Sequence, residues 1–365
     1  MMKRLSCARR TLLKSLPLLS LLLLTSPALA KDEFHLYNWN NYIAPETIKR
    51  FEDFCKCTVV QTYYSDNEEL LAKLAAGAKG YDMLVPTSNA VEALIKGKQL
   101  KPVDKSHLSN LKNIDPRYLN TPFDPGNQYS VPYAMSTTII GYNDVMMKEL
   151  GLPTDTWAVI FEPKHLEKVK GRVTVLDSSS EVFAAALKYL GYSVNDVDEK
   201  HWKEAQALIN KAKPYWAAFN ASSYIKELTV GNIWLVHGYS NDIFQANLDA
   251  IAAKRPFHIL QGMPKEGAVL AVDNMVIHKD APRPDLALKF MNFMLEGKNS
   301  SELTNLIGSG NPNMDAVKYI KPEIQQNPAI FPTKEVAAKL EQIKELTGAQ
   351  RRLRNRMWTE IKAGR

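Results

Sequence analysis

The sequence predicts an α/β protein built as two lobes. Segments typical of strands and helices alternate along most of the chain, which favours sheets with helices packed on their faces. After a 30-residue export segment, 335 residues remain, enough for two lobes of ordinary size. No internal repeat and no low-complexity linker interrupts the alternation. We therefore expect the chain to cross between the lobes rather than to form separate domains on a string.

Residues 1–30 are typical of a signal peptide. They hold five basic residues, no acidic residue, an apolar core at 16–24 and the cleavage motif Ala28-Leu29-Ala30. Arg9-Arg10 resembles a twin-arginine export motif, but the strongly apolar core favours the general secretory route. No cysteine directly follows the cleavage motif to accept a lipid. We expect a free periplasmic protein.

Removing this segment changes the charge balance. The whole chain carries 46 basic and 39 acidic residues, a net charge of +7, and the mature chain keeps 41 basic residues, a net charge of +2. A nucleic-acid partner has no support from this balance. The basic C-terminal segment around Arg351, Arg352, Arg354 and Arg356 carries an apolar stripe and is interpreted as a docked helix with a solvated face.

Cys7 leaves with the signal peptide, so the mature chain keeps Cys55 and Cys57. Both lie at a predicted helix-to-strand turn. Closing so small a ring on an extended segment is strained, which favours two separate half-buried thiols. A redox pair or a metal site stays open as the alternative, although no second ligand cluster with zinc spacing accompanies the pair. The sequence leaves their redox state undecided.

The predicted elements of the N-terminal part follow a β-α-β-α-β order. They are a strand at 34–39, a helix at 45–54 with Pro45 in its first turn, a strand at 57–64, a helix opened by the capping motif Ser65-Asp66-Asn67-Glu68 and ending near Gly77, and a short buried strand at 82–86. This order predicts a parallel sheet with covered faces.

A second alternating set follows. Its predicted strands are 173–176, 233–236, 257–260 and 268–278, and its predicted helices are 181–190, 202–213, 222–230, 243–254, 284–295, 334–346 and 349–362.

Open α/β sheets bind ligands beyond the carboxyl ends of their strands. The segments at those places are 39–42, 87–89, 177–181, 238–242 and 273–274, which together hold aromatic, amide, hydroxyl and carboxylate side chains but no Lys or Arg. Such a set suits a cation with an aliphatic body, because carboxylates accept charge-assisted hydrogen bonds and aromatic faces attract ammonium groups. Asp273, inside the largely apolar run 268–277, is the strongest single candidate, since an unpaired buried charge is costly.

At these residues the chain resembles the spermidine/putrescine-binding proteins of polyamine ABC transporters. The matching stretches cover essentially the whole mature chain: Leu36 to Pro45 with its Tyr-Asn-Trp opening, Gly80 to Thr87, Leu176 to Phe183, Gly238 to Asp242, Ile259 to Asp273, and Arg351 to Lys362. The opening motif is the most specific of them.

The resemblance implies a class II periplasmic-binding-protein fold, with two α/β lobes, hinge crossovers and a ligand cleft between the lobes. It places lobe 1 at 31–135 and 267–311, and lobe 2 at 136–266 and 312–365. It further implies that the ligand lies among Trp39, Asn40, Tyr42, Thr87, Glu181, Tyr239, Asp242 and Asp273, with no cofactor and no metal. The implied partners are a polyamine of the putrescine or spermidine class and the permease of an ABC importer, and we expect a monomer.

The chain departs from that family at four positions. Ala271 and Ser309 stand where aromatic residues are usual, Asn41 where an acid is usual, and Tyr239 where a Trp is usual. These changes suggest a roomier cleft with altered selectivity or weaker polyamine binding.

Two other functions remain as alternatives: a protein of the same fold that binds or senses a different small ligand, and an exported enzyme. The second is disfavoured, because the seven histidines form no H-E-x-x-H pair and no G-x-S-x-G motif is present.

Overall fold

The predicted alternation of strands and helices is present in the computed structural model, which describes residues 32–64 and 66–364. The predicted signal peptide lies outside the described residues, as does Ser65 of the predicted capping motif. Within the motif, Asp66 is the residue that caps the following helix, because its carboxylate accepts the backbone N–H of Glu69 at 2.7 Å.

In the described part of the chain, ten strands form one sheet. They are β1 (Asp32–Trp39), β2 (Cys57–Tyr64), β3 (Met83–Leu84), β4 (Leu100–Lys101), β5 (Ser130–Asn143), β6 (Val173–Val175), β7 (Ala218–Phe219), β8 (Leu235–Tyr239), β9 (Ile259–Gly262) and β10 (Val269–His278). Their order is β2-β1-β3-β10-β5-β8-β6-β7, with β4 paired to β10 and β9 paired to β5.

The described helices cover this sheet. They are α1 (Pro45–Cys55), α2 (Asn67–Ala75), α3 (Ser88–Lys96), α4 (Asp144–Glu149), α5 (Ala158–Phe161), α6 (Pro163–Leu166), α7 (Ser179–Tyr189), α8 (Glu199–Ala212), α9 (Tyr224–Val230), α10 (Ser240–Ala252), α11 (Pro284–Met294), α12 (Gly297–Ile307), α13 (Pro322–Gln325), α14 (Lys334–Ala337) and α15 (Gly348–Ala363). Short 3₁₀ turns lie at Lys105–His107, Leu111–Asn113, Pro116–Tyr118, Glu167–Val169, Lys213–Tyr215 and Met314–Tyr319.

Two groups of apolar cores divide the described chain into lobes. The cores of the first lobe gather side chains from 34–134 and 275–307, whereas the large core of the second lobe gathers side chains from 139–268 together with Ala329, Met357 and Ile361. No side chain belongs to both groups. Each lobe therefore has a hydrophobic core of its own. The two-lobe fold predicted from the sequence is confirmed.

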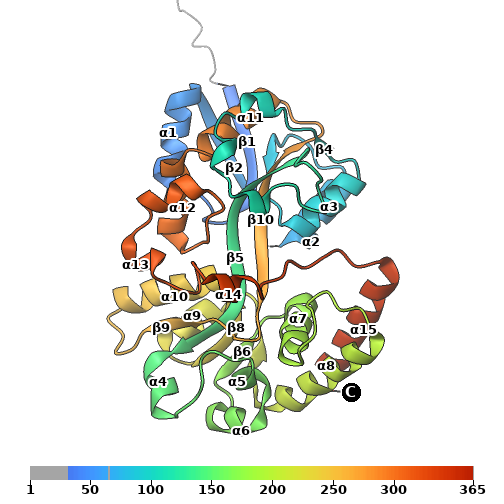
Figure 1. Cartoon of the computed structure of the whole chain (residues 1–365), viewed down its shortest axis with the longest axis vertical. Coiled ribbons are helices and arrows are strands. Elements are labelled where there is room, and N and C mark those ends of the chain that lie inside the picture. Colours follow the sequence, from blue (N-terminus) through green and yellow to red (C-terminus); the bar gives the residue numbers. More distant parts are fainter. Residues whose placement is uncertain (1–31, 65, 365) are drawn as a thin grey trace, which may run out of the picture. The chain divides into compact units, whose positions relative to one another are not determined.

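Strands β5 and β10 connect the lobes. Along β5, Tyr133 and Ala134 pack in the first lobe, while Ile139 and Ile140 pack in the second. Strand β10 runs antiparallel beside it through both lobes (Figure 1). The chain passes between the lobes a third time at Gly310. The backbones of Gly310 and Met135 exchange hydrogen bonds of 2.8 and 3.0 Å there.

The parallel sheet predicted for the N-terminal β-α-β-α-β part is confirmed, and a second parallel group lies in the other lobe. Strand β1 pairs with β2 and β3 in parallel, and β6 pairs with β7 and β8 in parallel. The two crossing strands pair antiparallel with their neighbours, so the whole sheet is mixed. The sequence pattern predicted no strand at Ser130–Asn143, because both of its faces are covered and its polar and apolar residues do not alternate.

The predicted helix at 334–346 is wrong. Helix α14 ends at Ala337, and the chain then runs extended past the start of β10. The N–H of Leu270 donates to the carbonyl of Glu341 at 2.9 Å, and the N–H of Glu341 donates to the carbonyl of Ala268 at 3.1 Å. Lys188 also pairs with the Glu341 carboxylate at 2.7 Å. These contacts with distant residues outweigh the local helix propensity.

The expectation of two separate thiols is also wrong, because Cys55 and Cys57 form a disulfide. The pair does lie at the predicted helix-to-strand turn, between the end of α1 and the start of β2. Lys56 adopts a left-handed conformation (φ 57°), so the segment is a tight turn rather than an extended strand. The turn brings the two Cα atoms within 5.2 Å, a normal distance for a disulfide.

Candidate functional site

The indole of Trp39 lies at the carboxyl end of β1, in the position predicted for a ligand-facing aromatic. Its Nε1–H donates to the carbonyl of Val85 at 2.8 Å, and its ring lies 4.5 Å from the ring of Tyr64. Tyr64 is the register partner of Trp39 on β2. The indole is half-buried, so it is fixed on one side by these contacts and still presents part of its surface outward.

Asp273 lies in β10, where the register shifts between Asp273 and Asn274. Its side chain is 5% exposed, yet both carboxylate oxygens have partners: the Tyr42 hydroxyl donates to Oδ2 at 2.6 Å, and the Thr87 hydroxyl donates to Oδ1 at 2.7 Å. Burial raises the pKa of Asp273 to about 6, although both hydroxyls act in the opposite direction. The structure thus brings three predicted site residues together.

The residues around Asp273 are themselves held in place. The amide of Asn67 donates to the Thr87 hydroxyl at 3.0 Å, and the Tyr133 hydroxyl donates to the carbonyl of Tyr42 at 2.7 Å. Tyr42 is 8% exposed, and its hydroxyl is committed to Asp273. This geometry indicates that Tyr42 positions the carboxylate, whereas half-buried Thr87 and Trp39 leave surface for a ligand.

In the second lobe, Asp242 lies in the first turn of α10, directly after β8. The Tyr224 hydroxyl donates to its carboxylate at 2.6 Å and accepts the backbone N–H of Tyr239 at 3.1 Å. Gly238 permits this arrangement, because a Cβ atom there would lie 2.8 Å from the Tyr224 ring. Burial raises the pKa of Asp242 above its ordinary value.

Glu181 lies in the first turn of α7, which Ser178 caps by accepting the Glu181 N–H. Its Oε2 atom is inaccessible to solvent and has no hydrogen-bond partner among the described residues. Burial raises the pKa of Glu181 to about 7, while Thr138 and the more distant Arg354 oppose the shift. A carboxylate oxygen that is buried without a partner is costly unless a ligand supplies one.

The charges of all three acids act on one side chain, that of Tyr239. Burial is the main cause of the raised pKa of Tyr239, and the negative charges of Glu181, Asp242, Asp66 and Asp273 raise it further. Tyr239 is the register partner of Thr138 on β5, so the ring lies beside one of the crossing strands. Carboxylates from both lobes therefore act on the same small volume.

Asp66 is the acid in this group that the sequence analysis did not select. Because Asp66 caps helix α2, an acid at this position already has a local structural explanation. Its position after the carboxyl end of β2 is the signal that could have identified it, since the same strand-end rule selected the other residues.

Asn40 is the predicted site residue that the structure joins least to the others. It is exposed in the turn after β1, and its side chain makes no hydrogen bond to any described residue. The remaining predicted residues form two sets: Trp39, Tyr42, Thr87 and Asp273 on one side, and Glu181, Tyr239 and Asp242 on the other.

The electrostatic character of the site is negative. None of Glu181, Asp242 and Asp273 forms an ion pair with a Lys or Arg among residues 32–64 and 66–364. The same part of the chain holds no group of three or more His, Cys, Asp or Glu side chains placed to bind a metal ion. A small organic cation is the ligand that this donor set fits best.

No helix in the described part of the chain is both long enough and apolar enough to cross a membrane.

Comparison with known proteins gives a consistent result. Residues 46–333 match the family described as bacterial extracellular solute-binding protein. The chain is 58% identical over 335 residues to the putrescine/cadaverine-binding protein of Pseudomonas aeruginosa, covering 92% of this chain and 95% of that protein. It is 35% identical to the putrescine-binding periplasmic protein PotF of Escherichia coli, covering 93% of each.

A solved structure shares the fold. The spermidine/putrescine ABC transporter substrate-binding protein PotD of Streptococcus pneumoniae superposes with a TM-score of 0.82 at 26% identity, covering 92% of this chain and 99% of that one. The resemblance and the fold class inferred from the sequence are thus both confirmed.

Proposed function

The chain belongs to the family of bacterial extracellular solute-binding proteins, and from that premise we propose that it captures a polyamine between its two lobes for an ABC importer. The relatives reported above are named for binding putrescine, cadaverine or spermidine. They are named as binding or transport proteins, which supports binding rather than catalysis as the activity of this chain.

The observation that carries the proposal is that the charges of Glu181, Asp242 and Asp273 all act on Tyr239, while no Lys or Arg among the described residues forms an ion pair with any of the three. Three carboxylates can accept hydrogen bonds from two ammonium groups. Trp39 and Tyr239 add aromatic surface for the methylenes between those groups, and each ring can contribute about 0.5–2 kcal/mol through a cation–π contact. Asn40 and Thr87 would supply further polar contacts.

The ligand that we favour is a short diamine, putrescine or cadaverine. Two nearby positions that carry rings in the family carry small residues here: Ala271 is half-buried, and Ser309 is 1% exposed. Fewer rings mean less stacking surface for a long polyamine. Asp66 contributes negative charge near Tyr239, and we propose that it offsets the acid that is missing at Asn41.

Lobe closure would complete the site. We propose lobe 1 at 31–135 and 267–311 and lobe 2 at 136–266 and 312–365, with the crossing strands and the passage at Gly310 as the hinge. Ala268, directly before β10, still packs in the core of lobe 2. Asp273 and Trp39 then lie in lobe 1, and Glu181, Tyr239 and Asp242 lie in lobe 2. A ligand that contacts both sets adds interactions only in the closed state, so binding shifts the population toward closure.

We further propose that the protein works as a monomer in the periplasm, after removal of residues 1–30, and delivers its ligand to the permease of the importer. A single lobe pair contains all of the proposed ligand contacts, so no second copy is required for binding.

Isothermal titration calorimetry of the mature chain tests the assignment. Putrescine and cadaverine should bind more tightly than spermidine and spermine, while 1-aminobutane, which has one ammonium group, should bind much more weakly. No binding heat from any of the four polyamines would reject the polyamine assignment and favour another ligand for the same fold.

A further inference from the structure

A cavity lies away from the carboxylate cluster. It has a volume of about 310 Å³, and small-molecule sites commonly span about 300–1,000 Å³. Its walls come from α10 and β9 of the second lobe and from the segment that runs from α12 to α13. None of the proposed polyamine contacts lines it. The cavity therefore is a separate feature, although Phe244 in its wall lies only two residues after Asp242.

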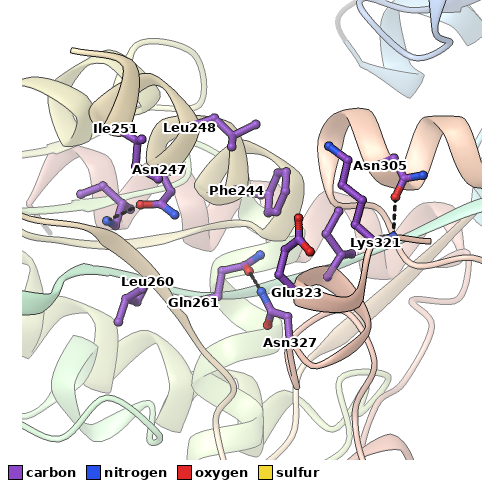
Figure 2. Close-up of a pocket in the computed structure, with 12 residues that line it drawn as sticks. Phe244, Asn247, Leu248, Ile251, Leu260, Gln261, Asn305, Lys321, Glu323 and Asn327 are labelled. Atoms are coloured by element: carbon purple, nitrogen blue, oxygen red, sulfur yellow. Dashed lines mark hydrogen bonds between the residues drawn. The ribbon is translucent and has the colours of Figure 1, made fainter. Parts of the chain in front are cut away.

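One wall of this cavity is apolar and unusually exposed. Leu248, Ile251 and Leu260 are 40%, 52% and 40% exposed, respectively. Figure 2 shows these side chains on one side of the cavity, with the ring of Phe244 standing between them and the opposite wall. Exposed aliphatic side chains gathered around a cavity are a feature of binding sites rather than of ordinary surface.

The opposite wall carries two opposite charges, Lys321 and Glu323. Neither the Lys321 ammonium nor the Glu323 carboxylate forms an ion pair or a side-chain hydrogen bond with any residue in the described ranges. Figure 2 shows both side chains extending along this wall, near Asn305 and Asn327. The two charges are therefore available to a ligand.

The amide side chains of Asn305, Asn327 and Gln261 already form hydrogen bonds, and these bonds hold the charged wall in place. Asn305 accepts the backbone N–H of Lys321 at 2.9 Å, and Asn327 donates to the side-chain oxygen of Gln261. The Gln261 amide in turn donates to the carbonyl of Ser240 at 2.8 Å. These bonds tie the segment carrying the charges to β9 and to the start of α10, so the charged and apolar walls face each other in a fixed arrangement.

We propose that this cavity binds an amino acid zwitterion with an aliphatic or aromatic side chain. Lys321 would hold the carboxylate, Glu323 would hold the ammonium group, and the side chain would pack against Phe244 and Leu248. A polyamine is unsuited to the cavity, because its second ammonium would meet Lys321 instead of a carboxylate. The two sites thus select ligands of different charge: the carboxylate cluster selects a dication, and this cavity selects a zwitterion with no net charge.

Saturation-transfer NMR tests the site with L-phenylalanine and L-leucine as probes, on the mature chain with and without excess putrescine. Both amino acids should receive saturation in either condition. 2-Phenylethylamine and 3-phenylpropionate each lack one of the two charges and should bind about three- to fivefold more weakly than phenylalanine. Glycine, which lacks a side chain, should give no signal.

Lys321→Gln and Glu323→Gln should each weaken phenylalanine binding by about three- to fivefold, and Leu248→Gln should weaken it as well. All three positions are exposed, so the fold should persist. The matched controls are Lys334→Gln and Glu335→Gln on α14, an exposed Lys and Glu that do not line the cavity, and they should leave binding unchanged.

Absence of saturation transfer to both amino acids would overturn the proposal. So would a phenylalanine affinity that is unchanged in all three cavity variants. A signal that putrescine abolishes would also overturn it, because the amino acid would then occupy the polyamine cleft. The cavity variants decide the question even if putrescine itself does not bind.

Discussion

Thr87 and Asp273 are joined twice: their backbones form an antiparallel bridge, and the Thr87 hydroxyl donates to the Asp273 carboxylate at 2.7 Å. The first residue follows the short strand β3, and the second lies on the crossing strand β10. This connection fixes a buried carboxylate at the point where the chain passes between the lobes. A ligand that pairs with Asp273 would therefore act directly on the hinge.

Removing either carboxylate that faces the proposed ligand should weaken binding. Asp273→Ala and Glu181→Ala each delete the acceptor of a charge-assisted hydrogen bond, which contributes about 1.5–3 kcal/mol, or roughly 10- to 100-fold in Kd. Calorimetry with putrescine measures the change, and circular dichroism checks that each variant folds. Asp280→Ala, in the exposed turn after the same strand β10, is the control. Unchanged affinity in both variants would exclude this site.

Polyamine affinity should rise with pH between about 5.5 and 8. Burial holds the pKa of Asp273 near 6 and that of Glu181 near 7, so both acids lose their protons over this range. The amines stay protonated there, because their pKa values lie near 10. Calorimetry in buffers of different ionisation enthalpy should show proton release at pH 6.5. Glu181→Gln should reduce this release, and a pH-independent affinity in the unmodified protein would contradict the assignment.

The ligand-free protein should become less stable as the pH rises from about 4.5 to 7. The folded-state pKa of Glu181, about 7, lies above its ordinary value of 4.5, so in this window the folded state binds more protons than the unfolded chain. Stability then falls with increasing pH, and the contribution of Glu181 is lost above its folded pKa. Urea unfolding should show a flatter pH dependence for Glu181→Gln. An equally steep dependence in the variant would show that other groups cause it.

Tyr42→Phe should alter the acidity of Asp273 as well as the affinity. The substitution removes the hydroxyl that donates to Asp273 at 2.6 Å and that lowers the pKa of this carboxyl. The midpoint of the affinity–pH curve should therefore move to higher pH. Tyr118→Phe, at a half-buried tyrosine outside the site, is the matched control. A loss of affinity with no movement of the midpoint would show that Tyr42 does not act through Asp273.

Breaking the Cys55–Cys57 disulfide should lower stability and leave polyamine affinity unchanged. The chain-entropy relation gives about 1–2 kcal/mol for so short a loop. Cys57 is the register partner of Asp32, whereas Trp39 pairs with Tyr64 at the other end of the same two strands, roughly 23 Å away at about 3.3 Å per residue. Urea unfolding and calorimetry of Cys55→Ser/Cys57→Ser measure the two effects. A weaker ligand affinity would link this turn to the cleft.

Gly238→Ala should destabilise the second lobe by about 1–3 kcal/mol, because the added Cβ would lie 2.8 Å from the Tyr224 ring and must displace it. Displacing Tyr224 also removes the donor to Asp242, so polyamine affinity should fall. Gly348→Ala, where the nearest atom is the end of the flexible Arg352 side chain at 3.4 Å, should change neither quantity. Equal behaviour of the two variants would show that the close approach at Gly238 is not required.

Local signals in the sequence were enough to predict several elements and the kinds of side chain that stand at the strand ends. The helix at 45–54 was found within one residue, since Pro45 opens it and the left-handed Lys56 ends it. Glu181 and Asp242 could be selected because they follow predicted buried strands. Asp273 could be selected because a charge inside an apolar run is costly unless it is paired.

How those parts meet could not be predicted and is evident from the folded chain. The folded chain contains the long strand β5, whose two ends lie in two different cores, and it has an extended segment hydrogen-bonded to β10 where a helix was expected at 334–346. It also closed the disulfide and placed Asp66 beside the other acids. For β5, the extended segment and Asp66 the physical reason is the same: these features depend on partners far away in the sequence, and a local pattern carries no information about a distant partner. The disulfide joins neighbours, but it depends on the left-handed conformation of Lys56, which is uncommon for a residue other than glycine.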